Sequence, residues 1–398
     1  MTTVYPLIVA GLFAELREPV WFSSPALVSD SLANDTLSYS HTMQAVGGFH
    51  SARLTVAVTD EMPDLWLERL GYDFTVYANG GADIVFNGFI DKISVNYGFY
   101  TLEIGPMLDI ANRVRVTYQT LGYDTNPPIP GQQASTAAAD DLTSQELYSI
   151  LVMEVSGGSG TSTEMAQLRD TTIAETAYPK TGQTVIPGQT AKGITVELSI
   201  TGYYHLLSRY YPNSSATGTI NLSTKIGLIL DGDPNAPNII IDERDIESNT
   251  TQVSANYGKG NESGSHAWEL LLNLLALGDS TYNRYVMGVY GKRRFEYREI
   301  DTDPDSGINY YMQLTRDRSL ITLPNLAELD YWLIRPAKFM FIEGILTDLG
   351  EMTSLVKDKR AIFIESVQFD APNRINLTGG RADSFAQKIA RLAFSSSY

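Results

Sequence analysis

The stretch that decides the fold is residues 74–118, which read FTVYANGGADIVFNGFIDKISVNYGFYTLEIGPMLDIANRVRVTY. Apolar and polar residues alternate in successive runs, which the turn sequences NGG at 79–81 and NYG at 96–98 separate. Alternation with a period of two, broken by Asn and Gly, is typical of hairpins with one buried face. After Gly-Pro at 105–106 a short helical pattern follows, and a strand pattern returns at 114–118. The stretch therefore predicts a small β-barrel or sandwich with one helix in a connection.

A second stretch, residues 195–210, resembles the end of the first. Both read as a strand, a Gly, a short amphipathic segment, an Arg and further strand residues. The distance from Gly to Arg differs by one residue between the two stretches. Two interpretations stay open, namely a pair of related barrels and the chance recurrence of a common motif.

Length and composition favour several domains. A chain of 398 residues is too long for one ordinary core, and 43% hydrophobic residues allow a packed interior. The 23 Tyr and 14 Phe residues favour strands. We therefore predict a mainly β protein with α+β insertions, in which two small β-barrel domains are accompanied by smaller α+β units.

The expected domains follow changes in the sequence pattern. Pro- and Gly-rich segments, such as residues 126–131 and 157–160, separate runs of strand-like and helix-like residues. The predicted divisions are 1–118 (first barrel-type domain with a helix insertion), 119–193 (inserted α+β unit), 194–264 (strands and loops that lead to the second barrel), 265–333 (helix–hairpin α+β unit) and 334–398 (second-barrel strands and a C-terminal helix).

Several elements are expected from periodicity and from helix-end signals. Helices are predicted over 60–71, anchored by Trp66, over 164–175, over 265–278 with Ser265 as N-cap, and over 383–393. Strands are predicted over 39–44, 52–58, 144–155, 238–241, 339–346, 361–369 and 374–378, with a hairpin over 285–300. Residues 326–333 fit either a helix or an irregular strand.

The charge and cysteine content exclude several classes of function. Cysteine is absent, so disulfides and thiolate sites are excluded. The first residues lack a basic region ahead of an apolar core, and no apolar run approaches the length of a membrane span, so we expect neither a secretory signal nor membrane insertion. A net charge of −17 argues against binding nucleic acid through its phosphates. The acidic excess fits two interpretations, solubility alone or a channel through which nucleic acid slides.

The residue types that carry chemistry do not form a recognisable site. The histidines His41, His50, His205 and His266 lack the spacing of a zinc-binding helix, so we expect them to be structural or exposed. Gly258-x-Gly260-x-x-Ser263 lacks the third Gly of a dinucleotide fingerprint and has no βαβ frame, so a turn is expected.

The acidic loop Asp301–Gly307 superficially resembles a calcium loop. Pro304 interrupts the loop, and Met312 stands where a bidentate Glu is required, so no specific calcium binding is expected. No pair of carboxylates is singled out as a glycosidase pair. The sequence therefore predicts no catalytic residues, no cofactor-binding residues and no metal-binding residues, and it argues against an enzyme.

Taken together, several strings resemble the hub proteins of phage tail tips and baseplates, in particular the hub-like minor tail proteins of long-tailed phages. The strings are YSHTM at 39–43 with Gly47-Gly48, VFNGFI at 85–90, IGPMLDIANRV at 104–114, residues 268–278 with 285–297, IFIESV at 362–367 and LTGG at 377–380. In that family, two small barrels form a trimeric ring that joins the sixfold tail tube to a threefold spike or fibre. The chain ends soon after its last expected helix, so the receptor-binding or peptidoglycan-cleaving extension of some hubs is not expected.

The resemblance implies a structural virion protein of the tail tip or baseplate, a homotrimer that is made in the host cytoplasm. The implied partners are the tail tube or distal tail protein, the tape measure protein and the central spike or fibre, with DNA passing through and not binding specifically. We expect an acidic inner surface, for which Asp83, Asp91 and Glu197 are candidates. The alternative is a receptor- or carbohydrate-binding β-module at the tail tip, which a solvent-exposed row of Tyr or Trp would favour.

Overall fold

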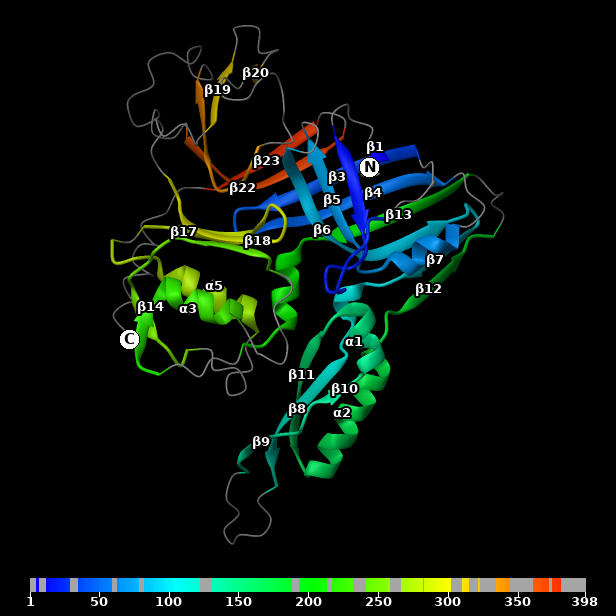
Figure 1. Ribbon diagram of the computed structural model, residues 1–398, viewed down its shortest axis with the longest axis vertical. Coiled ribbons are helices and arrows are strands. Elements are labelled where there is room, and N and C mark those ends of the chain that lie inside the picture. Colours follow the sequence, from blue (N-terminus) through cyan, green and yellow to red (C-terminus); the bar gives the residue numbers. More distant parts are fainter. Residues whose placement is uncertain are drawn as a thin grey trace.

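The computed structural model describes residues 5–6, 12–28, 35–58, 63–78, 82–121, 131–187, 193–212, 217–231, 241–257, 266–281, 283–301, 310–314, 321–322, 334–343, 361–371 and 374–380. Strands dominate these residues, and the few helices lie against or beside them (Figure 1). The prediction of a mainly β protein with α+β parts is confirmed.

One large sheet organises the molecule. Hydrogen bonds join its strands in the order β1-β2-β5-β6-β13-β4-β3-β22-β23. The strands are β1 (Tyr5–Pro6), β2 (Phe13–Arg17), β3 (Asp35–Gln44), β4 (Gly47–Val58), β5 (Asp73–Ala78), β6 (Asp83–Asn96), β13 (Ile194–Thr201), β22 (Ala361–Asp370) and β23 (Arg374–Gly380). The strands expected in the two barrels are therefore joined edge to edge in one sheet.

Further strands extend this sheet at both sides. β7 (Tyr100–Ile104) pairs with the second half of β6, and β12 (Thr181–Val185) pairs with β7. On the other side, β21 (Phe339–Glu343) pairs with β22 and with β19 (Tyr310–Leu314), and β19 pairs with β20 (Ile321–Thr322).

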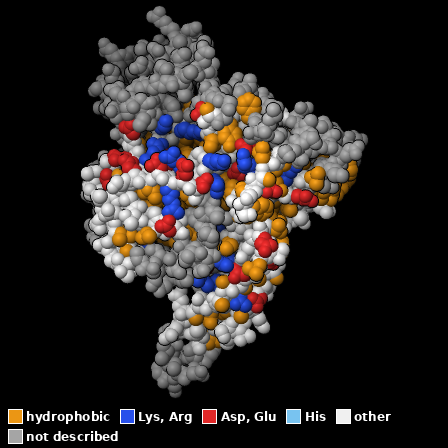
Figure 2. All heavy atoms as spheres, in the orientation of Figure 1, with side chains coloured by type: hydrophobic (Ala, Val, Ile, Leu, Met, Phe, Trp, Pro, Cys, Tyr) orange, Lys and Arg blue, Asp and Glu red, His pale blue; other side chains and the backbone are white. Residues whose placement is uncertain are grey.

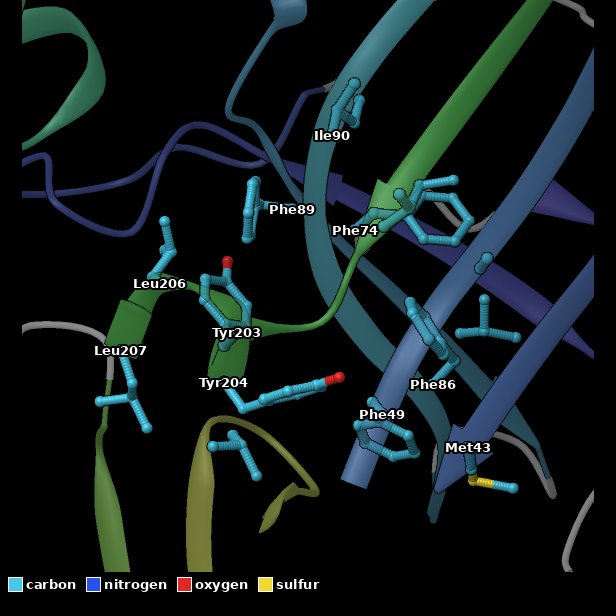
Figure 3. Close-up of a cluster of buried hydrophobic side chains, with 14 of the residues drawn as sticks. Met43, Phe49, Phe74, Phe86, Phe89, Ile90, Tyr203, Tyr204, Leu206 and Leu207 are labelled. Atoms are coloured by element: carbon cyan, nitrogen blue, oxygen red, sulfur yellow. The ribbon is translucent and has the colours of Figure 1, made fainter. Parts of the chain in front are cut away.

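The alternating sequence pattern places the core on one side of the sheet. Alternate residues are buried in β4 (Ala52, Leu54, Val56 and Val58) and in β13 (Val196, Leu198 and Ile200). The 3-10 helix η4 (Tyr203–Arg209) follows β13 and brings Tyr203, Leu206 and Leu207 against the same core (Figure 3). Each fully buried side chain of this size contributes roughly 1.5–3 kcal/mol. The sheet and η4 share one hydrophobic core.

A polar cluster lies inside this core. The Asp73 carboxylate, which is 3% exposed, accepts hydrogen bonds from the Tyr203 hydroxyl at 2.7 Å, the Asn87 side-chain amide at 2.9 Å and the Thr75 hydroxyl at 3.2 Å. Burial raises the pKa of Asp73, while the bonds from Tyr203 and Asn87 oppose that rise. The cluster ties η4 to β5 and β6 through one buried acid.

Arg335 fixes the C-terminal segment to the first strands. Its guanidinium donates to the carbonyl oxygens of Val85, at 3.1 Å, and of Ile84, and it lies 5.3 Å from the centre of the Phe49 ring. The hydrogen bonds join residues about 250 positions apart, so the described segment 334–338 packs against the same core as β4 and β6.

A smaller α+β unit projects from the sheet, at the bottom of Figure 1. Its strands are β8 (Arg113–Thr120), β9 (Gln133–Ser135), β10 (Ala139–Asp140) and β11 (Val152–Gly160), and its helices are α1 (Leu142–Tyr148) and α2 (Ser162–Thr176). β8 pairs with all three other strands. A capping box begins α2, since Thr161 and Glu164 each accept the other's backbone N–H.

The remaining unit packs two helices beside a hairpin. It contains β14 (Thr219–Asn221), α3 (Leu222–Asp231), β15 (Glu243–Ile246), β16 (Gln252–Ser254), α5 (Ala267–Leu277), β17 (Tyr285–Tyr290) and β18 (Arg294–Glu299). β17 crosses onto β4 where Gly288 and Val289 pair with Gly47 and Gly48. A Cβ atom on Gly288 would lie 2.5 Å from the Gly48 nitrogen, so the crossing requires glycine.

Most predicted elements are present with shifted ends. The predicted hairpin over 285–300 and the helix over 164–175 are confirmed as β17–β18 and α2. Trp66 is a buried anchor in the 3-10 helix η1 (Pro63–Arg69). The helical segment after Pro106 is only η3 (Met107–Asp109).

Three predictions need correction. Residues 144–155 do not form one strand, because the Asp141 side chain accepts the Ser144 N–H at 2.9 Å and begins α1 there. The N-cap of α5 is His266, whose ring nitrogen accepts the Glu269 N–H, and not Ser265. The strand predicted at 114–118 forms, but as β8 it pairs within the projecting unit and does not close the first barrel.

Some predictions fall outside the described residues. They are the Ser265 position itself, most of the strand at 238–241, residues 326–333, the end of the strand at 339–346, the helix at 383–393, the motif at 258–263 and residues 302–307 of the acidic loop. These remain predictions from the sequence.

Candidate functional surface

The side of the large sheet that faces away from the core is a continuous polar surface, which we call the polar face. The strand registers place its residues side by side from β12 to β23. They are Gly182 and Thr184 of β12, Thr101 and Glu103 of β7, Lys92, Ser94 and Asn96 of β6, Thr195, Glu197, Ser199 and Thr201 of β13, Ser51, Arg53 and Thr55 of β4, Ser38, Ser40, Thr42 and Gln44 of β3, Ser366, Gln368 and Asp370 of β22, and Arg374, Asn376 and Thr378 of β23.

The polar face exists because one sequence pattern repeats in successive strands. In β3, the polar residues Ser40 and Thr42 alternate with the buried Tyr39, His41 and Met43. Since side chains of a strand point alternately to the two faces, every apolar residue that enters the core leaves a neighbour outside. Those neighbours are mostly Ser, Thr, Asn and Gln, so this surface is short-chained and hydroxyl-rich.

The charges on the polar face are balanced and mostly paired. Among its residues, Lys92, Arg53 and Arg374 oppose Glu103, Glu197 and Asp370. Lys92 lies 3.0 Å from Glu103, Arg53 lies 3.9 Å from Glu197, and Arg374 stands opposite Asp370 in the register. The Lys92 hydrogen bond lowers the pKa of Glu103, so this carboxylate is ionised at neutral pH. Exposed pairs of this kind add little stability, so their effect is to keep the surface neutral.

The three acidic residues predicted to line a passage have different environments. Glu197 is exposed on the polar face, beside Arg53. Asp91 lies at a bulge in β6, where its carboxylate accepts the Leu108 N–H at 2.9 Å. Asp91 is partly buried, which raises its pKa, and its bond to Leu108 holds η3 against β6. Asp83 begins β6, pairs with Ala78 and is partly buried.

An apolar rim lies at one end of the polar face. Leu37, Phe99, Val185 and Ile186 are exposed, and the registers place them at the same end of β3, β7 and β12. Val185 is the most exposed of them, at 63%. Hydrophobic side chains gather over the β7–β12 end of the molecule (Figure 2).

The four histidines divide into three environments. His41 is buried among Tyr39, Phe86 and Phe369, and burial lowers its pKa to about 3. His266 caps α5. His50 and His205 meet, with His205 Nε2 3.1 Å from His50 Nδ1. They are 155 positions apart, and no local spacing in the sequence announces the contact.

We searched the described part of the chain for metal-binding clusters, rows of exposed aromatic residues and membrane-spanning helices. There, no group of three or more His, Cys, Asp and Glu side chains is placed to hold a metal ion. The large aromatic residues exposed there are Phe99 and Tyr178, which do not form a row of Tyr or Trp. Among the same residues, no helix combines the length and the apolar character that crossing a bilayer requires.

Comparison with known proteins gives matches among solved structures alone. No protein-family model and no curated protein matches the chain. The E. coli c3393 protein, a type VI secretion component described as structurally similar to the T4 bacteriophage tail proteins gp27 and gp5, matches with TM-score 0.41 and 9% identity over 90% of this chain and 76% of its own. A tail protein from Neisseria meningitidis MC58 matches with TM-score 0.40 and 10% identity, and the match covers 93% of this chain and 97% of that protein. The prophage tail protein gp18 from Listeria monocytogenes EGD-e matches with TM-score 0.36 and 10% identity, and the match covers 98% of this chain and 100% of that protein.

Proposed function

We propose that the chain is a non-enzymatic structural protein of a phage tail, a homotrimeric hub or baseplate component that joins the tail tube to a central spike or fibre. The observation that supports it is the polar face, a wide, charge-balanced surface backed by the hydrophobic core. The partners in this proposal are the tail tube or distal tail protein, the tape measure protein and the spike or fibre, with the virion tail as the location.

A closed ring needs two different contact surfaces on each subunit. In the described residues, β12 pairs only with β7, while β23 pairs only with β22, so the polar face ends in two unlike strands. Contact between one end of a subunit and the other end of the next is heterologous, and it closes a ring when the rotation is 120°. Three residues of the apolar rim, Phe99, Val185 and Ile186, lie at β7 and β12 and supply hydrophobic surface for such a contact.

The polar face is suited to a wall past which DNA moves. A protein gains affinity for DNA when Lys and Arg neutralise phosphates and release counterions. Here each of the basic residues Lys92, Arg53 and Arg374 stands beside or opposite an acid. The wall we propose is therefore neutral and not net acidic, in contrast to the expectation from the net charge.

Light scattering after size-exclusion chromatography tests the oligomer. Three copies of the 43.9 kDa chain have a mass of about 132 kDa, which we expect at micromolar concentration. A dimer under all conditions would contradict the hub assignment.

A DNA-binding measurement tests the wall separately. We expect no saturable binding of a labelled duplex by the trimer at low salt, down to about 50 mM. The matched variants Glu197→Gln and Glu103→Gln free Arg53 and Lys92, so measurable, salt-dependent binding should appear in the double variant. Tight binding by the unmodified trimer would refute a passive wall while leaving the trimer standing.

A further inference from the structure

Two imidazole nitrogens that belong to distant parts of the chain lie in direct contact. His205 Nε2 is 3.1 Å from His50 Nδ1, and the Tyr204 hydroxyl oxygen is 2.6 Å from the same His50 nitrogen. A ring nitrogen offers either one proton or one lone pair, so His50 Nδ1 cannot serve both neighbours fully. We propose that His50 and His205 form a binding site for a divalent transition metal ion that prefers nitrogen ligands, such as Zn²⁺ or Cu²⁺.

The backbone holds the two rings in place before any ion arrives. The Gly202 N–H donates to the His50 carbonyl at 2.9 Å, and the His205 N–H donates to the Gly202 carbonyl at 3.2 Å. A Cβ atom on Gly202 would lie 1.7 Å from the Phe49 oxygen, so β4 and the start of η4 touch through glycine. Because two backbone hydrogen bonds connect the ligands, little conformational entropy is lost when a metal joins them.

The separation of the nitrogens suits a shared ion. Zn–N bonds are about 2.0–2.1 Å, which separates two nitrogens of a tetrahedral site by roughly 3.3–3.4 Å. The observed 3.1 Å needs an adjustment of only a few tenths of an ångström. Imidazole is a ligand that Zn²⁺ and Cu²⁺ accept, whereas Mg²⁺ and Ca²⁺ prefer oxygen.

The rings are neutral at the pH at which a metal would bind. Burial lowers the pKa of His50, and burial followed by the neighbouring His50 lowers the pKa of His205 to about 4. Protons therefore do not compete with a metal at neutral pH. Both rings are only partly buried, so an ion can reach them from solvent. Burial raises the pKa of Tyr204, which stays a neutral phenol. Water would supply the remaining ligands of a bound ion.

Titration calorimetry of the full chain with ZnCl₂ and with CuCl₂ tests the site. We expect one ion per chain for each metal and no saturable binding of Mg²⁺ or Ca²⁺. His50→Gln and His205→Gln should each weaken binding by at least about tenfold. The matched control is His266→Asn, which removes an imidazole but keeps an N-capping side chain, so its affinity should be unchanged.

A fluorescence measurement gives an independent readout. The Trp268 ring lies 4.8 Å from the Tyr204 ring, so bound Cu²⁺ should quench part of the tryptophan emission, and Trp268→Phe should remove that part. Circular dichroism identifies any variant that fails to fold. Equal affinity in the His50→Gln/His205→Gln double variant, or no saturable binding up to millimolar metal, would overturn the proposal. Neither result depends on whether the chain is a trimer.

Discussion

Replacing Tyr203 by Phe tests how much the hydrogen bond to the buried Asp73, which joins η4 to the sheet, contributes to stability. The substitution removes only the hydroxyl, and the ring keeps its position beside Phe89, 5.6 Å between centres. The Asp73 carboxylate loses its shortest hydrogen bond, at 2.7 Å, and retains those from Asn87 and Thr75. A hydrogen bond to a charged group contributes about 1.5–3 kcal/mol, so we expect a loss of about 2 kcal/mol of unfolding free energy at pH 7.

The loss should depend on pH in a direction that the structure fixes. Burial already raises the pKa of Asp73 above its value in the unfolded chain, and losing a donor to the charged form raises it further. A raised folded-state pKa gives stability that is present below the unfolded pKa, near 3.9, and is lost as pH rises through the folded pKa. The variant should therefore be closest to the unmodified protein near pH 4, and its destabilisation should grow as the pH rises through the folded-state pKa of Asp73.

Urea unfolding at pH 4 and pH 7 measures both quantities from the midpoints, provided that the slope m is unchanged. The control is Tyr290→Phe, because the Tyr290 hydroxyl donates to a neutral group, the Gln44 carbonyl, at 3.0 Å. Its cost should be about 1 kcal/mol and the same at both pH values. Equal losses at the two pH values for Tyr203→Phe would show that Asp73 is not the group that carries the effect.

Three further substitutions test how the outer units are built. Gly288→Ala places a Cβ atom 2.5 Å from the Gly48 nitrogen, so it should lower the free energy of unfolding by about 1–3 kcal/mol, measured by thermal unfolding. The control is Gly227→Ala in α3, which has open space around it and should be neutral or stabilising. Thr161→Ala removes the N-cap of α2 and should cost about 1 kcal/mol, seen as faster amide exchange in the first turn of that helix. A slower or unchanged exchange there would contradict the capping role.

Local patterns predicted the strands well, because alternation depends only on which face of a strand is buried. The order of the strands was not predictable in the same way. β13 lies between β4 and β6, and β22 lies beside β3, although these partners are far apart in the sequence. Such pairings are decided by the packing of whole faces, and many partners present the same alternation.

The candidate sites show the same division between local and long-range information. The hydroxyl-rich residues of the polar face are visible in the sequence as the polar half of each alternating strand. That these residues form one surface can be seen only from the strand registers, which the sequence does not give. The contact between His50 and His205 depends on the turn at Gly202, which carries no signal of the histidine 155 positions away. Helix α1 was missed because Asp141 acts as an N-cap, and that effect outweighed the strand-like run after it.

The distribution of charge on the polar face bears on the two interpretations of the acidic composition, which are solubility alone and a channel for nucleic acid. The chain carries a net charge of −17, yet the polar face has as many basic as acidic residues among those named above. The excess acids therefore lie elsewhere, and at physiological salt charges more than about 8 Å away are largely screened. In the ring proposed here, repulsion is not what keeps DNA from the wall. Instead Lys92 and Arg53 are paired with Glu103 and Glu197, so these two cations are less available to phosphates, and contact with DNA there would release few counterions. In that proposal the acidic excess contributes to the solubility of the subunit, and the paired charges of the polar face keep DNA from binding to the wall.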